Sequence, residues 1–432
     1  MLSQRLNNKG KRTRTFSVQT HGNSMFPLLQ SGDIVEYIQL PFHKIYLNDI
    51  ILVHVNNIPF THRVIYKTKT TYVTRGDNNE FADTEVKKRR VLAKVIRFQR
   101  KGVWHEIGDV YLTQSAFYLH EIQKLEAVLN AQKVPHVFLK GVLVSLRYEG
   151  KIPRRIYADC DILISRTYTQ KTHNVFKTLG YLTQEPALRQ LQRLPKGPSA
   201  KPEVNFMKVV GGVPVVFDVH FEPVFLMTQI AGMNFMYPPN KLKKLGEHII
   251  ANREMKKVQG FIYPLCSAPD QILYLALHIF HHNFTDSVRY QLLDSIIRKT
   301  ATKNTWSLIR SAIKSYQLEG YLSLVFILLK KYYHTPIPPS FLAGIRPHTF
   351  KKWVLNSMEC HINIFSQENG LRVGIMRFFY AFLLSPEPFL KKIIIFVHPQ
   401  VCFAGLSLVW LSLVNRWGVR RSMCELPPTS AY

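Results

Sequence analysis

Residues 16–110 alternate between short apolar runs and turn-forming residues. The runs are rich in valine, isoleucine, tyrosine and threonine, and glycine, asparagine, aspartate and proline separate them. This pattern is typical of short β-strands. The strands are expected at 33–38, 49–55, 60–66, 70–74 and 91–98. The segment is therefore predicted to be a β domain.

A helical periodicity begins near residue 114. From Gln114 to Gln132 apolar residues recur at helical spacing, which predicts a long amphipathic helix. Residues 136–225 then alternate between strand-like and helix-like segments, as α/β and α+β domains do. Within them, strands are expected at 137–139, 161–164, 206–210 and 213–219, and a helix at 172–180. From residue 269 onward the runs predict mostly helix.

The fold class predicted from these patterns is a multidomain chain. A length of 432 residues suits two or three domains. The expected segments are 1–15, a basic arm; 16–110, the β domain; 111–265, an α/β (α+β) domain; and 266–432, a helical C-terminal region.

The net charge of the chain indicates what kind of partner it binds. It has 57 lysines and arginines against 28 acids, a formal net charge of +29, while a hydrophobic fraction of 46% excludes a disordered chain. Such a charge favours anionic partners: nucleic acid, nucleotide phosphates or an acidic membrane surface. Five scattered cysteines without a close pair indicate neither a zinc site nor a disulfide framework, so a reducing, cytoplasmic setting is expected.

One apolar stretch near the C-terminus bears on membranes. Its uninterrupted part, Val401–Val414, is shorter than the roughly 20 residues that a spanning helix needs. Basic residues flank it on both sides. We expect a buried or surface-lying helix, so the chain is cytoplasmic or attached peripherally to the inner membrane face.

Three motifs in the β domain point to hydrolysis when taken together. Ser24 lies in Ser-Met-Phe-Pro-Leu-Leu-Gln-Ser-Gly-Asp-Ile-Val, and His62 lies in Thr-His-Arg-Val-Ile. Asp77 and Asp83 lie in Gly-Asp-Asn-Asn-Glu-Phe-Ala-Asp. A serine becomes a nucleophile when a base such as histidine takes its proton, and a carboxylate then orients the histidine.

This set resembles the type I signal peptidase family, in the endoplasmic-reticulum and archaeal-type branch that uses histidine as the base. The resemblance implies a mostly antiparallel β fold, a peptide or protein substrate, Ser24 as nucleophile and His62 as base. It assigns Asp83 to orient His62 and makes Asp77 a second essential acid. The 23 residues before Ser24 are basic and polar where the family carries a membrane anchor, so a substrate other than a translocating preprotein is expected.

A second constellation gathers acids after a Lys-Gly pair. Lys140-Gly141 follows a predicted strand, and Asp159 and Asp161 lie two apart, so that in a strand they point to one side. Two carboxylates aimed together repel unless a cation lies between them, and Mg²⁺ suits such oxygen ligands. Asp218, from a neighbouring strand, completes a site for phosphoryl chemistry.

This arrangement resembles the nucleotidyltransferase superfamily and, more narrowly, a poorly characterised bacterial nucleotidyltransferase-like family. Over about residues 112–400 the resemblance implies Mg²⁺ at the three aspartates and a nucleoside triphosphate as substrate. Lys140, Gly141 and Arg155 are expected to bind the nucleotide. Lys-Gly stands where the better-known superfamily members carry Gly-Ser or Gly-Gly.

A further histidine cluster follows in the helical region, formed by His278, His281 and His282. Helical spacing places His278 and His282 on one face, which suits a metal pair. No metalloprotease glutamate accompanies them, so a core or substrate-facing role is favoured over metal binding.

Two overall interpretations remain. The first is a serine peptidase fused to a Mg²⁺-dependent nucleotidyltransferase-like domain, in a setting such as peptide maturation. The second is a non-catalytic basic protein with relic sites, which binds nucleic acid or a membrane surface through residues such as those of the run Lys87-Lys88-Arg89-Arg90. We favour the first because every motif position retains its acid. Nucleic acid is not an expected partner, since no recognised binding motif is present.

Overall fold

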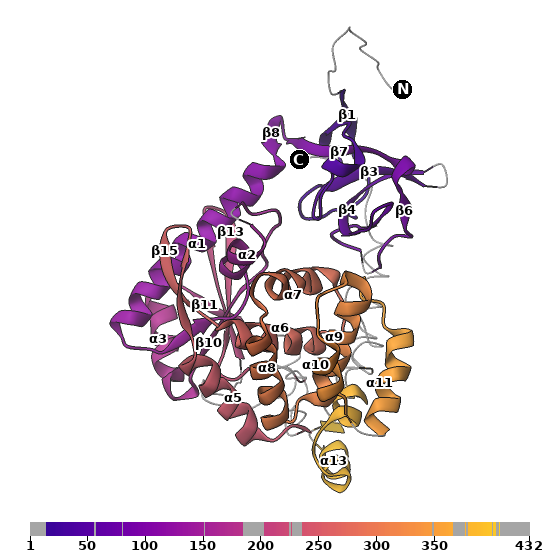
Figure 1. Cartoon of the computed structure of the whole chain (residues 1–432). Coiled ribbons are helices and arrows are strands. Elements are labelled where there is room, and N and C mark those ends of the chain that lie inside the picture. Colours follow the sequence, from indigo (N-terminus) through magenta and orange to yellow (C-terminus); the bar gives the residue numbers. More distant parts are fainter. Residues whose placement is uncertain are drawn as a thin grey trace. The chain divides into compact units, whose positions relative to one another are not determined.

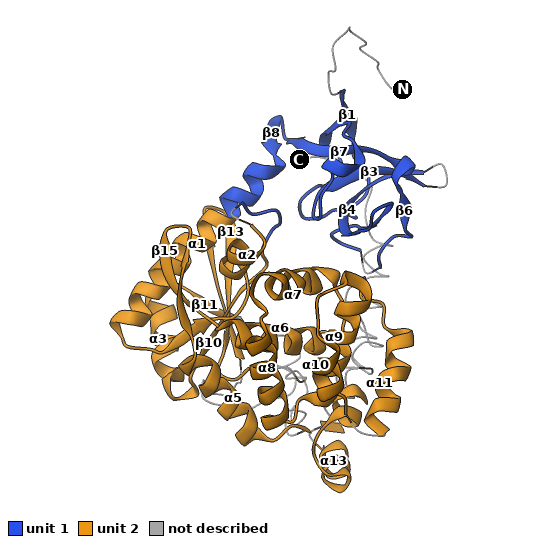
Figure 2. Cartoon of the chain, in the orientation of Figure 1, with its two compact units in different colours: residues 1–114, 152–156, 365–367 blue, residues 115–151, 157–364, 368–432 orange. Residues whose placement is uncertain are grey.

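The computed structural model consists of two compact units, which Figure 1 shows along the sequence and Figure 2 distinguishes by colour. The first unit contains residues 1–114 with two short segments, 152–156 and 365–367, and the second contains the remainder. The structure describes residues 14–55, 58–79, 81–150, 152–184, 203–223, 226, 236–347, 350–365, 376, 379–399, 401–402 and 406.

The first unit is built on an antiparallel sheet. Seven strands follow the order β1-β2-β7-β3-β4-β5-β6, and β8 pairs with β7. The strands are β1 Thr15–Gln19, β2 Ile34–Ile38, β3 Ile50–Val55, β4 Ile58–Lys67, β5 Thr71–Arg75, β6 Val86–Lys87, β7 Val91–Arg100 and β8 Val103–Glu106, with short 3-10 turns η1 Phe42–Lys44 and η2 Lys88–Arg90. All the strand pairs are antiparallel, as expected. The five predicted strands are confirmed, and β1, β6 and β8 are additional.

Two apolar clusters stabilise this sheet. One contains Val35 and Val95 together with Met25, Leu28 and Leu29 from the segment after Ser24. The second contains Ile45, Ile51, Val53, Val64, Tyr72 and Val86. Burial of three apolar residues directly after Ser24 fixes the serine segment against the sheet, because apolar side chains removed from water hold the backbone that carries them.

The second unit has a mixed sheet with the order β11-β12-β13-β10-β9-β15-β14. Its strands are β9 His136–Phe138, β10 Cys160–Ile164, β11 Leu182–Gln184, β12 Glu203–Val210, β13 Val213–His220, β14 Glu254–Val258 and β15 Phe261–Leu265. Two neighbouring pairs are parallel, β10 with β13 and β9 with β15. The four predicted strands are confirmed, whereas β11, β14 and β15 were not predicted.

Helices follow the chain order given in Figure 1, and those from α6 onward form the helical C-terminal part of the second unit. They are α1 Ile107–Ala131, α2 Val142–Tyr148, α3 Thr169–Thr178, α5 Pro239–Ala251, α6 Ala268–His281, α7 Ser287–Thr300, α8 Lys303–Ser315, α9 Glu319–Tyr333, α10 Pro339–Gly344, α11 Phe350–His361 and α13 Phe389–Phe396, with η3 Arg166–Tyr168 before α3. The prediction of a mixed α and β region followed by helices is confirmed.

The start of α1 differs from the prediction. The helix begins at Ile107, before the expected Gln114. Its first turns carry Ile107, Val110 and Tyr111, which pack against the apolar cluster of the first unit. Tertiary packing therefore extends the helix through a stretch whose glycine and polar residues obscure the period.

No helix among the described residues is both long enough and apolar enough to cross a membrane. Nearly all of the predicted surface-lying helix at 401–414 falls outside the described residues.

An aromatic cluster fixes α3 against the strands that carry the acidic residues. The Phe176 ring stacks on Phe206 of β12, with 4.1 Å between ring centroids, and meets Phe217 of β13 edge-on. All three side chains are buried. This packing holds β13 in place directly beside Asp218.

The first prediction concerns this cluster. Phe176→Ala should lower the free energy of unfolding by about 3–5 kcal/mol, because a large buried ring is lost and a cavity remains. Urea unfolding followed by near-ultraviolet circular dichroism measures the loss. Phe176→Leu, which fills much of the space, should cost less, and equal losses for the two variants would contradict the stacking argument.

Candidate functional site

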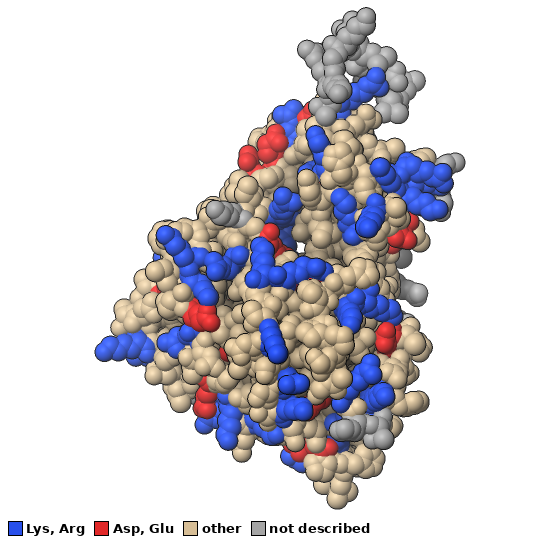
Figure 3. Space-filling view, viewed as in Figure 1, with Lys and Arg blue, Asp and Glu red and all other residues tan. Residues whose placement is uncertain are grey.

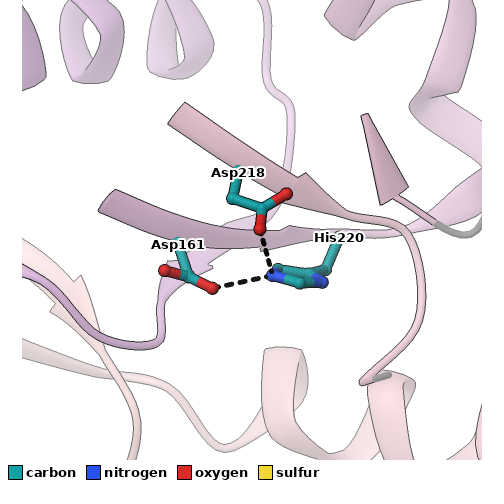
Figure 4. A group of neighbouring side chains, drawn as sticks. All are labelled: Asp161, Asp218 and His220. Carbon is teal, nitrogen blue, oxygen red and sulfur yellow. Dashed lines mark hydrogen bonds and ion pairs between the residues drawn. The ribbon is translucent and has the colours of Figure 1, made fainter. Parts of the chain in front are cut away.

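The register of two parallel strands creates the main candidate site. Asp161 of β10 lies directly opposite Asp218 of β13. His220, two residues further along β13, points to the same face as Asp218. Figure 4 shows the three side chains converging, and one ligand atom from each lies within 4.8 Å of the others. Asp161 therefore lies beside Asp218 and His220 in space, although they are almost sixty positions apart in the sequence.

Lys140 supplies one positive charge at this site. Its Nζ lies 2.6 Å from Asp161 Oδ2 and 3.0 Å from Asp159 Oδ1. Burial opposes the charged lysine, but Asp159 and Asp161 outweigh burial and raise the pKa of Lys140. Asp159 lies one residue before β10 rather than inside the strand. Even so, both carboxylates reach the same ammonium group.

Gly141 explains how Lys140 approaches so closely. Its φ is +96°, and an added Cβ would lie 3.0 Å from the Asp159 carbonyl oxygen and 3.1 Å from Cys160 Cα. Glycine adopts this conformation without the steric penalty that other residues meet. The Lys-Gly pair therefore lets the turn before α2 pack against the start of β10.

His220 connects the two carboxylates. Its Nε2 donates to Asp161 Oδ1 at 2.8 Å and lies 3.7 Å from Asp218 Oδ2. Burial opposes the charged imidazolium, but Asp218, Asp161 and Glu203 overcome it and raise the pKa of His220 to about 9. At neutral pH His220 is therefore protonated and acts as a donor to Asp161.

The two aspartates carry their charges differently. Burial tends to raise the pKa of Asp161, but Lys140 and His220 prevail and lower it. For Asp218, burial together with Asp161 and Glu203 raises the pKa to about 7, despite His220 and Lys140. Asp161 is thus the ionised member of the pair, and Asp218 is close to titrating at neutral pH.

Unsatisfied polar atoms surround the same point. Asp218 Oδ1 and the Tyr274 hydroxyl of α6 are buried, and neither has a hydrogen-bond partner among the described residues. Burial, followed by the charges of Asp161 and Asp218, raises the pKa of Tyr274 well above its ordinary value. Buried polar groups normally find partners, so these atoms fit a site that receives a cation or a polar ligand.

The donor set suits a divalent cation. Carboxylate oxygens of Asp161 and Asp218 are the ligand type that Mg²⁺ prefers, and the His220 bond orients Asp161 as outer partners of metal ligands do. Asp159, the third expected ligand, lies outside this group and contacts Lys140. His220 was not predicted as a site residue. Its position two residues after Asp218 was the available signal, since both then share one face of a strand.

The predicted histidine cluster lies on α6 and just beyond its end. Rings of His278 and His282 are 4.5 Å apart between centroids. Burial, followed by the charges of Lys140 and Arg289, lowers the pKa of His278 well below its ordinary value. Among the described residues these histidines form no cluster with metal-binding geometry.

In the first unit, the residues of the predicted serine site have three separate sets of partners. His62 Nδ1 lies 2.6 Å from Asp83 Oδ2, and the Thr74 hydroxyl donates to the same oxygen at 2.7 Å. Ser24 is held by its backbone, because its carbonyl accepts from the Asn78 amide at 2.8 Å. Within the described part of the chain, no hydrogen bond joins Ser24 to His62.

Asp77 has a different partner from Asp83. It accepts from Arg63 Nε at 2.7 Å and from Arg63 Nη2 at 2.6 Å. Arg63 also donates to the Tyr111 hydroxyl at 2.7 Å and to the Asn48 carbonyl at 2.9 Å. In this geometry Asp77 neutralises a buried arginine, while its expected role as a second essential acid stays a prediction.

Arg155 belongs to the segment 152–156 of the first unit. Its expected contact with a nucleotide therefore stays a prediction, as do the individual roles of Lys140 and Gly141.

Comparison with known proteins identifies the class of the second unit. The family described as uncharacterised nucleotidyltransferase matches residues 103–334, which contain Lys140, Asp161, Asp218 and His220. This match covers more than half of the chain. No curated protein matches the chain. None of these comparisons supports the resemblance of residues 16–110 to signal peptidases.

Two solved structures show a distant likeness. One is the solution structure of the antibiotic-resistance factor ANT(2'')-Ia, with 13% identity over 52% of this chain and 98% of that chain, and a TM-score of 0.29. The other is an antigenic nucleotidyltransferase-like protein from Paracoccidioides brasiliensis, with 10% identity over 49% and 91% of the two chains and a TM-score of 0.28.

The second prediction tests the charge balance of the site. The pKa of Asp218 is raised to about 7, so in metal-free protein its ionisation costs stability as pH rises from about 4 to 7. Asp218→Asn removes this cost. The variant should melt higher than the wild type at pH 8, and the difference should shrink toward pH 4.

Scanning calorimetry with and without Mg²⁺ measures this balance. Mg²⁺ at pH 8 should raise the melting temperature of the wild type and leave Asp218→Asn almost unchanged. A variant that melts lower at every pH would mean that Asp218 is a structural group.

Proposed function

We propose that this chain, which belongs to the uncharacterised nucleotidyltransferase family, transfers a nucleotidyl group from a nucleoside triphosphate to an acceptor at the Asp161–Asp218 site. The observation that supports the proposal is the parallel register of β10 and β13, which sets two carboxylates side by side next to a buried lysine. In the reaction, an acceptor atom bonds to the α-phosphorus, and the bond from that phosphorus to pyrophosphate breaks.

Asp161 and Asp218 would hold Mg²⁺ in this reaction, with His220 orienting Asp161. When bound, the metal offsets the negative charge that develops on the triphosphate. Lys140 forms ion pairs with both Asp159 and Asp161 in the structure. The triphosphate competes with the carboxylates for this ammonium group. When Lys140 moves to the triphosphate, the carboxylates become free to bind the metal.

Nucleotide and metal binding are therefore coupled through Lys140. Without nucleotide, a metal ion must displace an ammonium group that lies 2.6 Å from Asp161. With nucleotide, Lys140 has phosphate oxygens to bind instead, and both cations keep an anionic partner.

The third prediction follows from this exchange. Lys140→Gln should strengthen the binding of Mg²⁺ alone, because a competing cation is removed, and should weaken Mg²⁺-dependent nucleotide binding by about tenfold or more. Isothermal titration with Mg²⁺, and then with ATP, GTP, CTP and UTP in turn, measures both effects.

Lys243→Gln is the matched control, because Lys243 lies on α5 with a side chain that is 71% exposed. It should change neither titration. If Lys140→Gln lowered the affinity for Mg²⁺ alone, the exchange would be refuted. If no nucleotide bound the wild type with Mg²⁺, the transferase function would fail.

We further propose a second function, serine peptidase activity of the first unit. The observation in its favour is the His62–Asp83 pair, in which Thr74 also holds the carboxylate. Asp83 fixes the ring through Nδ1, which leaves Nε2 to accept the proton of Ser24 once a peptide substrate is bound. A fusion of the two activities would suit the maturation of a peptide, with one unit cutting and the other modifying.

The fourth prediction tests the serine directly. A fluorophosphonate probe should label the wild-type chain at Ser24, because the probe reacts with serines whose hydroxyl is activated by a base. Ser24→Ala and His62→Ala should each abolish labelling. Ser31→Ala, in the same motif, should label normally. A folded wild-type protein that the probe does not modify would contradict the peptidase proposal.

A further inference from the structure

A hollow of about 540 Å³ lies in the first unit, apart from the residues of the predicted serine site. Its size falls in the range of pockets that take a small ligand or a few side chains. The lining residues are Leu40, Phe42, Ile45, Thr70, Thr71, Lys87, Lys88, Arg89 and Val91.

The basic residues of β7 have acidic partners, whereas the cationic residues of this hollow have none among the described residues. Along β7, Lys94 pairs with Asp49 at 2.8 Å, Arg97 pairs with Glu36, and Arg100 pairs with Asp33 at 2.7 Å. In contrast, the hollow residues Lys87, Lys88 and Arg89 are exposed and have no acidic partner within the described part of the chain. Figure 3 shows lysine and arginine side chains gathered where Figure 1 labels β6.

One acid lies beside these cations without cancelling them. The Thr71 hydroxyl, which lines the hollow, donates to the Glu85 carboxylate. Three cationic side chains against this one carboxylate leave the hollow positive. Charge gathered at a concave, partly apolar surface attracts anions more strongly than the same charge spread over an open face.

The floor of the hollow is apolar. Ile45 is buried, and Phe42 and Val91 are partly buried and pack on the core cluster beneath them. The Phe42 ring already carries two ammonium groups, Lys67 at 5.0 Å and Lys88 at 5.5 Å from the ring centroid. Lys88 therefore lies against the apolar floor while it remains one of the three cationic residues that line the hollow.

A sheet edge runs along the same hollow. β6 is the last strand in the order of the sheet, and it pairs with β5 through Thr71–Lys87 and Tyr72–Val86. Among the described strands, β6 has a neighbour on one side only. An exposed edge presents backbone groups to which an extended peptide can add as a further strand.

We propose that this hollow binds an acidic peptide segment in extended conformation, with glutamate or aspartate side chains against Lys87, Lys88 and Arg89 and an apolar side chain on the Phe42–Ile45–Val91 floor. Alternation along a strand delivers this pattern, because every second side chain points to one side. The proposal is independent of the transferase and peptidase functions, since none of these residues belongs to either site.

Fluorescence anisotropy with the full chain tests the proposal. The probe is a labelled eight-residue peptide of alternating glutamate and valine, at low salt. It should bind, and Lys88→Glu together with Arg89→Glu should weaken its binding by about tenfold, as expected for the loss of two exposed charge pairs. Lys101→Glu is the control, because this exposed lysine follows the far end of β7 from the hollow.

Three results would overturn the proposal. Equal weakening by Lys101→Glu would show attraction to net charge alone. Equal affinity for a peptide of glutamate and serine would show that the apolar floor plays no part. Tighter binding of an octathymidine, lost in the double variant, would assign the surface to nucleic acid. Circular dichroism confirms that each variant is folded.

Discussion

The buried Lys140 ammonium is the charge on which the arrangement of the second unit depends. Asp161 is buried, and Asp218 lies beside it in the register of β10 and β13. Two carboxylates so close in a poorly solvated place are costly, and Lys140 offsets this cost at Asp161 while His220 lies between the two acids. Gly141 allows the backbone approach that delivers this lysine. Sheet register, a glycine conformation and one ion pair are therefore parts of a single constraint.

Local sequence patterns predicted many of the strands and several of the site residues. The strands of the first unit were readable because turn residues separate short apolar runs, and Asp161, Asp218 and Lys140 stood out by their spacing. The contacts between them are non-local, so the sequence could not show that His220 joins Asp161 or that Asp159 stays with Lys140. Strand β14, Glu254–Val258, was missed because three of its five residues are charged and its apolar residues, Met255 and Val258, do not alternate with polar ones.

The described basic residues of the first unit are of two kinds, those paired with acids and those without an acidic partner. Lys94, Arg97 and Arg100 of β7 form ion pairs with Asp49, Glu36 and Asp33, which lie within or directly before the neighbouring strands β3 and β2. These basic residues therefore stabilise the fold. Lys87, Lys88 and Arg89 remain without acidic partners among the described residues and give the hollow a positive potential. Net charge alone, as counted in the sequence, cannot separate these uses, because the pairing depends on which strands lie side by side.

The two histidine–aspartate pairs, His62–Asp83 and His220–Asp161, differ in the charges that surround them. His62 has one carboxylate partner, Asp83, which is itself shared with Thr74. His220 faces Asp161, Asp218 and Glu203, and together they raise its pKa to about 9 against the effect of burial. The Nε2 atom of His220 holds Asp161, whereas Asp83 holds the ring of His62 through Nδ1.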